Sequence, residues 1–75
     1  MDLFRPYVEF AVQYRYRGDS IWSFAVDPRS ESPYDQAIFD TEEEAREVLD
    51  ILLRTGDSRF ENRVVKRSII EEALV

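Results

Sequence analysis

The chain has 75 residues, of which 44% are hydrophobic and 13% aromatic, so it can form one small domain (residues 1–75) with a compact core. It carries 16 acidic and 10 basic residues, a net charge of -6, and contains neither cysteine nor histidine. This composition excludes disulfides, zinc sites built on Cys or His, thiolate nucleophiles and imidazole acid–base catalysis. The apolar runs are short, so we expect neither a membrane-spanning helix nor a signal-peptide core.

The charge is distributed unevenly along the chain. Residues 1–30 have no net charge, residues 31–50 carry eight acids and one base, and residues 51–75 have a net charge of +1. The negative charge therefore comes from the middle of the sequence. Nine of the ten basic residues are arginines, a ratio typical of proteins encoded by GC-rich genomes.

The first half of the chain predicts a β-hairpin. Over residues 8–17 mainly apolar side chains alternate with mainly polar ones, the period of a half-buried strand. In the second run, residues 21–26, the large side chains of Trp22, Phe24 and Val26 alternate with those of Ile21, Ser23 and Ala25. Gly18 and Asp19 lie between the two runs, and one of them is expected to adopt a positive φ in the turn. Residues 27–36, with two prolines, are predicted to form a flexible loop.

The length of the hairpin turn decides which face of the sheet carries the aromatic residues. A two-residue loop places Trp22 and Phe24 on the face of polar residues such as Gln13. A loop of three or five residues places Phe24 opposite Tyr14 and near Val12 instead. We predict the odd-length loop, because it gathers the large aromatic residues on one buried face, under a helix.

That helix is predicted to begin near residue 41. Asp40 with Glu43, or Thr41 with Glu44, forms a capping box, and Gly56 is expected just after the last turn. One apolar stripe should face the sheet, and it consists of Ala45, Val48, Leu49 and Leu52. Two flanking residues are expected to be half-buried, and these are Ile51 and Leu53.

Residues 60–70 predict a final strand, and residues 37–39 add a brief strand before the helix. The inward face of the final strand stays open, because residues 64–65 and 69–70 are apolar pairs. The tail, residues 71–75, forms either a frayed end or part of an interface. The predicted fold class is α+β: two layers, with a three- or four-stranded antiparallel sheet and one helix across one face, in the order β-β-(β)-α-β.

The residues with chemical potential do not form a catalytic set. The serines and threonines have no histidine to activate them, and Lys66 is the only lysine. A carboxylate cluster such as Glu42, Glu43 and Glu44 could hold Mg²⁺, but acidic residues also stabilise the first turn of a helix. We therefore expect no enzyme activity, no cofactor and no metal site.

Three segments carry a resemblance to other proteins: Trp22, residues 39–45 (FDTEEEA) and residues 63–67 (RVVKR). Together they resemble the small orphan proteins of phages and mobile elements in GC-rich bacteria. The resemblance implies a phage accessory protein, in a group whose members include inhibitors of host enzymes and of host defence, such as anti-CRISPRs. It assigns no residue a role.

An acidic, aromatic-rich domain without catalytic residues favours a protein-interaction module in the cytoplasm of a bacterial host. The expected partner is a host or phage protein, with a basic nucleic-acid-binding groove as one possible target of the acidic helix face. The alternatives are a nucleic-acid-binding domain that uses strand aromatics and arginines, against which the acidic balance argues, and a self-assembling structural protein. A homodimer through a sheet edge or the tail would cover apolar residues that a small domain leaves exposed. The predicted partner-binding residues are Glu43, Glu47, Asp50, Arg54, Tyr34 and Asp35.

Overall fold

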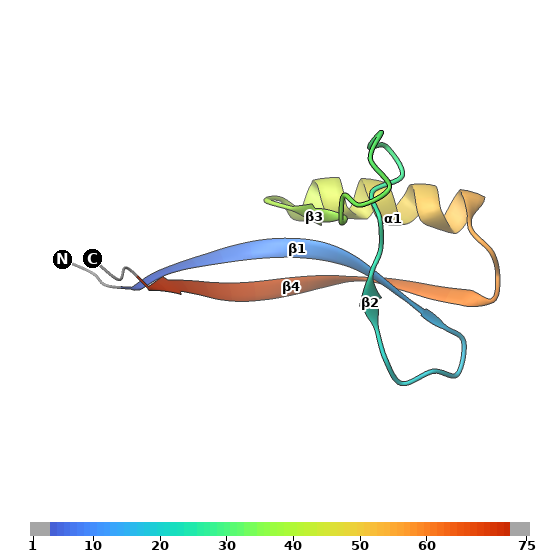
Figure 1. The fold of residues 1–75 in the computed structure, drawn as a ribbon, viewed down its shortest axis with the longest axis horizontal. Helices are drawn as coiled ribbons and strands as arrows, with labels where there is room; N and C mark the ends of the chain where they lie inside the picture. Colours follow the sequence, from blue (N-terminus) through green and yellow to red (C-terminus); the bar gives the residue numbers. More distant parts are fainter. Residues whose placement is uncertain (1–3, 73–75) are drawn as a thin grey trace.

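The computed structural model describes residues 4–72, which form five elements (Figure 1). These are β1 (Phe4–Tyr16), β2 (Ser23–Phe24), β3 (Ile38–Phe39), α1 (Glu42–Thr55) and β4 (Phe60–Glu72). The strands build a four-stranded antiparallel sheet, and α1 lies across one face of it. The predicted α+β class and order of elements are confirmed. Residues 71–72 of the predicted tail belong to β4, and residues 73–75 lie outside the described residues.

Strand β1 is the centre of the sheet. One edge of β1 pairs with β4 along its whole length, from Phe4 opposite Glu72 to Tyr16 opposite Phe60. Its other edge pairs with the two short strands β3 and β2 in succession. A strand rises about twice as far per residue as a helix, so β1 and β4 extend beyond α1. The N-terminal part of β1 and the C-terminal part of β4 form a two-stranded ribbon there (Figure 1), and the molecule measures 49 × 28 × 21 Å. The ends of the described chain lie together at the tip of this ribbon.

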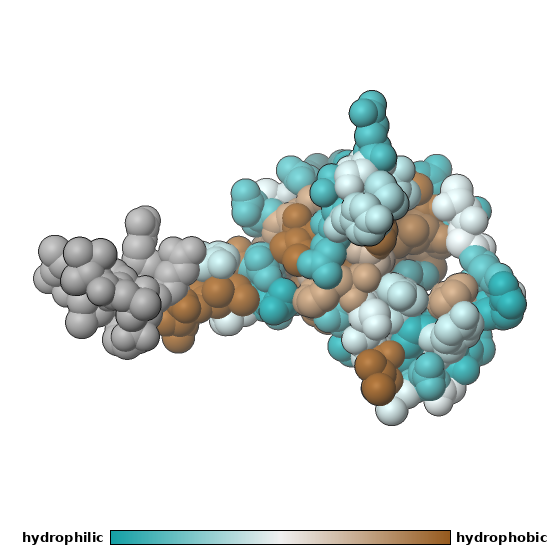
Figure 2. Space-filling model, viewed as in Figure 1, coloured by the Kyte–Doolittle hydropathy of each residue, from teal (hydrophilic) through white to brown (hydrophobic). Residues whose placement is uncertain are grey.

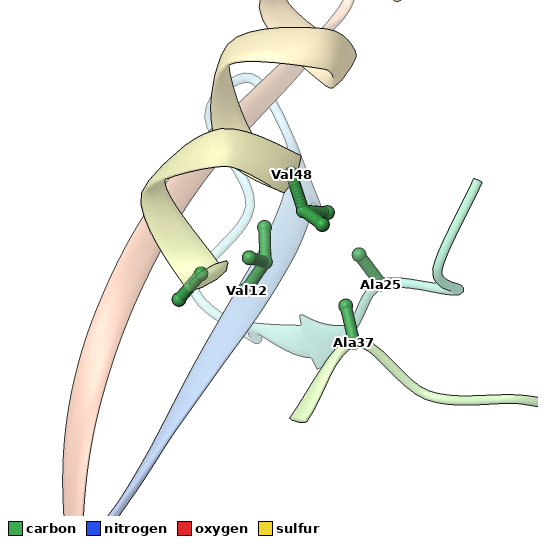
Figure 3. Packing of buried hydrophobic residues seen from close by; sticks show 5 residues of the cluster. Val12, Ala25, Ala37 and Val48 are labelled. Carbon is green, nitrogen blue, oxygen red and sulfur yellow. The ribbon is translucent and has the colours of Figure 1, made fainter. Parts of the chain in front are cut away.

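The core lies where α1 crosses the sheet, and its side chains are small. Figure 3 shows four of its buried members together, Val12, Ala25, Ala37 and Val48, and Ala45 belongs to the same cluster. The N–H of Val12 donates to the carbonyl of Ala37 over 2.9 Å, and the carbonyl of Val12 accepts from Ala25 N–H over 2.9 Å. Three backbone segments and the helix thus meet at one point, so only small side chains fit there.

The predicted register of β2 is wrong. Phe24 lies opposite Gln13, and Ser23 lies opposite Tyr14, which is the parity of the rejected two-residue loop. Since residues directly opposite each other share a face, Phe24 lies on the face away from the helix, and Trp22 is on that face beside Arg15. The alanines at 25 and 37 face the helix in their place. The close contact between helix and sheet at this point leaves room for alanines, and Trp22 and Phe24 instead pack against arginine side chains on the other face.

The helix ends follow the sequence signals. Thr41 is the N-cap: its backbone is extended, and its Oγ1 accepts from the N–H of Glu44 over 3.3 Å. Of the two predicted capping pairs, the structure thus uses Thr41 with Glu44, through the bond from the Glu44 backbone N–H to the Thr41 side chain alone among the residues described. At the other end Gly56 has a φ of -83°, so it is not required for a left-handed conformation. A Cβ at this position would lie 2.3 Å from the Leu52 carbonyl oxygen, so the close approach of the backbone requires glycine.

The predicted apolar stripe of the helix is confirmed. Ala45 and Val48 are buried, and Leu49 and Leu52 pack against them half-buried. Leu53 is 63% exposed, so its predicted half-burial is wrong: it lies on the solvent side of the last turn. In the β1–β2 connection, Gly18 has a φ of +93°, as the turn was predicted to require.

Candidate functional site

The loop of residues 27–36 rises from the sheet beside the helix (Figure 1). Its base is closed by the bridge between Val26 and Gln36 and by a hydrogen bond of 2.8 Å from Asp27 N–H to the Asp35 carbonyl. Above the base, Ser30 Oγ donates to the Asp35 carboxylate and also accepts from Ser32 N–H over 3.1 Å. These bonds give the loop, which the sequence predicted only as a flexible segment, a defined shape.

Arg29 connects this loop to the helix. Its guanidinium lies 3.6 Å from the Glu47 carboxylate, and its Cζ lies 5.4 Å from the ring centroid of Phe39. The two regions that the sequence proposed as separate binding surfaces are therefore adjacent. We call their combined outer side the loop–helix surface. The sequence carries no local signal for this contact, because it depends on the path of the loop.

The predicted partner-binding residues are exposed on this surface. Tyr34 is 88% exposed in the loop, the highest exposed fraction among the large hydrophobic residues that the structure describes. Glu43, Glu47 and Asp50 line a shallow hollow along the outer side of α1, together with Glu42 and Arg46. Arg54 lies one turn beyond, paired with Asp50 over 3.3 Å.

The loop–helix surface carries the excess charge of the chain. Residues 27–55 contain nine acidic and three basic residues, a net charge of -6, which equals the net charge of the whole sequence. All three arginines in this segment form ion pairs: Arg46 with Glu42, Arg54 with Asp50, and Arg29 with Glu47. Among residues 4–72, Glu43 and Glu44 have no ion-pair partner, so their charges at the N-terminal end of α1 are not neutralised by a neighbouring cation.

An apolar cleft that the sequence did not predict lies between the C-terminal half of α1 and the sheet. Its volume is about 330 Å³. Its lining is mainly apolar, with Tyr14, Val26, Leu52 and Phe60, and it includes two polar residues, Asp57 and Asn62. Figure 2 shows hydrophobic surface along this junction of helix and sheet, bordered by hydrophilic residues. Since Val26 directly precedes the loop and Leu52 belongs to the helix, the cleft adjoins the loop–helix surface.

The face of the sheet away from the helix carries a ladder of polar pairs. Glu9 accepts from Arg67 over 2.7 Å, and Arg15 donates to Glu61 over 2.9 Å, each across one β1–β4 register pair. Between them, Arg63 donates to the side chain of Gln13 over 2.8 Å.

The two aromatic residues of this face pack against the arginines of the ladder. The guanidinium carbons of Arg15 and Arg63 lie 4.4 and 4.1 Å from the Trp22 ring centroid, and that of Arg67 lies 4.8 Å from Phe24. Cation–π contacts thus cover the aromatic residues that the sequence analysis placed in the core.

One carboxylate at the rim of the cleft has a perturbed pKa. The side chain of Arg59 donates to Asp57 over 2.8 Å, and the Arg59 backbone N–H adds a second bond of 2.8 Å. These hydrogen bonds, the side-chain bond first, hold the pKa of Asp57 below its ordinary value of 3.8. Asp57 is therefore ionised at neutral pH and anchors the turn between α1 and β4.

Within residues 4–72, no cluster of acidic residues has the geometry of a metal site, and no helix is long and apolar enough to cross a membrane. No protein-family model, no curated protein and no solved structure matches the chain. The candidate site therefore rests on geometry: a negatively charged surface with an exposed tyrosine, adjacent to an apolar cleft.

Proposed function

We propose that the chain is a non-catalytic protein-interaction module that binds a basic partner protein through its loop–helix surface. The observation that carries this proposal is the contact of Arg29 with Glu47, which joins the loop and the helix into one surface with a net charge of -6. Carboxylates on such a surface would lie where phosphates lie in a nucleic-acid-binding groove. The module would then act by competition, and it needs no catalytic group.

Tyr34 and the apolar cleft supply the short-range part of the proposed recognition. Charge complementarity steers association and selects partners, whereas buried aromatic and aliphatic groups supply most of the affinity of an interface. An exposed tyrosine on the loop is such a group on this chain, and the cleft beside Leu52 fits an apolar side chain of the partner. The proposed interface thus has a charged part and an apolar part on one side of the molecule.

The biological setting that we propose follows from the resemblance to small phage proteins. In that setting the module inhibits or modulates a host protein in the bacterial cytoplasm, as anti-CRISPRs do. A second copy of the chain is a further proposed partner, at a different surface.

The experiment that tests this function is capture of the partner from lysate of a GC-rich bacterial host, with charge variants as probes. Wild-type protein and the triple variant Glu43→Lys, Glu47→Lys and Asp50→Lys are immobilised in parallel, and captured proteins are identified by mass spectrometry. We expect a basic protein that the wild type retains and the triple variant does not.

Two further variants make the test specific. Asp19→Lys changes the net charge by the same amount as Glu43→Lys, but Asp19 is an exposed residue of the β1–β2 connection, away from the loop–helix surface. Glu43→Lys should weaken capture and Asp19→Lys should not. Equal capture by the triple variant and the wild type would refute the proposal.

A second candidate function is nucleic-acid binding by the open face of the sheet. The observation that favours it is the position of Trp22 and Phe24, which lie on the face without a helix and beside three arginines. Exposed strand aromatics flanked by arginines stack bases in several single-strand-binding folds. Trp22 is the only tryptophan, so titration with single-stranded oligonucleotides at low salt should quench its fluorescence if this face binds bases. Unchanged fluorescence, with no mobility shift, would reject this function.

A further inference from the structure

The outer edge of β4 is the longest unpaired edge of the sheet. Among residues 4–72, β4 pairs with β1 alone, so the backbone groups on its other side have no strand partner. Natural proteins rarely leave a long edge open, because it is a template for another strand. Figure 2 also shows hydrophobic surface on the ribbon beside the grey termini. There Ile70 is 65% exposed, and Tyr7 and Val8 of the adjacent strand are 42% and 40% exposed.

We propose that this edge pairs with the same edge of a second copy of the chain, antiparallel and centred on Arg67. A two-fold axis perpendicular to the sheet relates such strands, so each residue lies opposite one of the same parity and on the same face. The result is one continuous sheet with both helices on the same side. Residues 62–72 of the two copies are paired, which is an edge about 34 Å long at ~3.4 Å per residue.

The sequence of β4 is complementary to itself in this register. Val64 lies opposite Ile70 on the helix face, and Val65 lies opposite Ile69 on the open face, and symmetry repeats each pair. The sequence left open which residue of each apolar doublet, 64–65 and 69–70, faces inward. In this pairing one residue of each doublet forms a cross-strand contact on each face of the sheet. Cross-strand pairs of β-branched residues are among the more stabilising pairs in antiparallel sheets.

Charge also favours this register over its neighbours. Arg63 lies opposite position 71, which is a glutamate. The two copies of Arg67 meet at the axis, but each is already held by Glu9 at 2.7 Å, so two neutral ion pairs meet rather than two cations. Centring the pairing on residue 66 instead places Lys66 opposite Lys66, and Arg63 opposite Ile69.

A centre at residue 68 is also unfavourable. It places Lys66 opposite Ile70 and Arg67 opposite Ile69, so both apolar residues would face a cation. Only the centre at Arg67 matches both apolar doublets. A second copy therefore fits this edge better than an unrelated strand, since its own sequence supplies the matching residues.

The mass of the protein in solution tests the pairing. Light scattering over a concentration series should give a dimer for the wild type and a monomer for Ile70→Asp. That substitution should raise the Kd of the dimer by about tenfold or more, equivalent to ~1.4 kcal/mol. Ile70 is exposed in the single chain, so the variant should keep its fold, which circular dichroism verifies.

Leu53→Asp is the matched control, because Leu53 is 63% exposed but lies on the helix. This variant should remain a dimer. A wild type that stays monomeric at every concentration would overturn the proposal, and so would equal weakening of the dimer by both variants.

Cysteine cross-linking tests the register, because the natural chain has no cysteine. Residues on the two-fold axis face their own copy with a Cα separation of about 4.5–5.5 Å, which a disulfide can span. Among Lys66→Cys, Arg67→Cys and Ser68→Cys, mild oxidation should cross-link the position 67 variant fastest. Faster cross-linking at position 66 or 68 would refute the register centred on Arg67.

Discussion

Truncation of Val48 tests how the core of this protein is built. Val48 is fully buried on the face of α1 that contacts the sheet, and Val48→Ala removes two methyl groups. At ~0.8 kcal/mol for each buried carbon, plus a cost for the cavity that remains, we expect a loss of about 2–3 kcal/mol in the free energy of unfolding. A domain of this length has a total of roughly 4–11 kcal/mol. The variant should therefore melt about 10–20 °C below the wild type.

The informative comparison is with Trp22→Ala. Because Trp22 is half-buried on the open face and contacts two guanidinium groups, its truncation should cost only about 1–2 kcal/mol. Urea and thermal unfolding, followed by far-ultraviolet circular dichroism, measure both variants without a tryptophan signal. A larger loss for Trp22→Ala than for Val48→Ala would refute the face assignment of β2 and restore the aromatic core that the sequence predicted.

Three further variants test the ends of the helix. Thr41→Ala removes the N-cap and should lower the unfolding free energy by ~1 kcal/mol in urea denaturation; an unchanged midpoint would contradict the cap. Gly56→Ala places a Cβ against the Leu52 carbonyl oxygen and should lower the melting temperature, although φ is negative there; a stabilised variant would show that the close approach is absent. Asp57→Asn removes a carboxylate whose pKa the Arg59 hydrogen bonds lower, so its stabilising effect is present above pH 3.8 and is lost as the pH falls through the depressed pKa. The stability difference between wild type and Asp57→Asn should therefore disappear in acid; a difference that persists below the depressed pKa would contradict the linkage.

Local signals in the sequence predicted most of the elements. The N-cap at Thr41, the apolar stripe that contains Val48, and the positive φ of Gly18 depend on residues close in the chain, and the structure confirms all three. The strands followed from alternation in the first half of the chain and from short apolar runs in the second half. These features need no knowledge of which segments meet in space.

The register of β2 could not be predicted in this way. The register of β2 depends on how closely the helix approaches the sheet. Alanines allow this close approach, and the sequence does not show that they meet, because they come from segments that converge on Val12 only in the folded chain. The assumption that large aromatic residues occupy the core placed Trp22 on the wrong face. Its arginine contacts come from β1 and β4, strands whose pairing is the longest-range contact in the chain.

The candidate site also has a part that the sequence predicted and a part that it did not. The exposed residues Glu43, Glu47 and Asp50 followed from helical periodicity, and the structure places them on one outer face. The contact of Arg29 with Glu47 and the cleft beside Leu52 depend on the path of the loop, which no local pattern specifies.

The most direct test of the proposed function is the salt dependence of association between this protein and the captured basic partner. Exposed charges steer encounter and are screened within about 10 Å at 0.1 M salt. Surface plasmon resonance at increasing salt should show the association rate constant of the wild type falling steeply. The variant with lysine at positions 43, 47 and 50 should associate slowly at every salt concentration. Equal, salt-independent rates for the two proteins would contradict binding through the loop–helix surface.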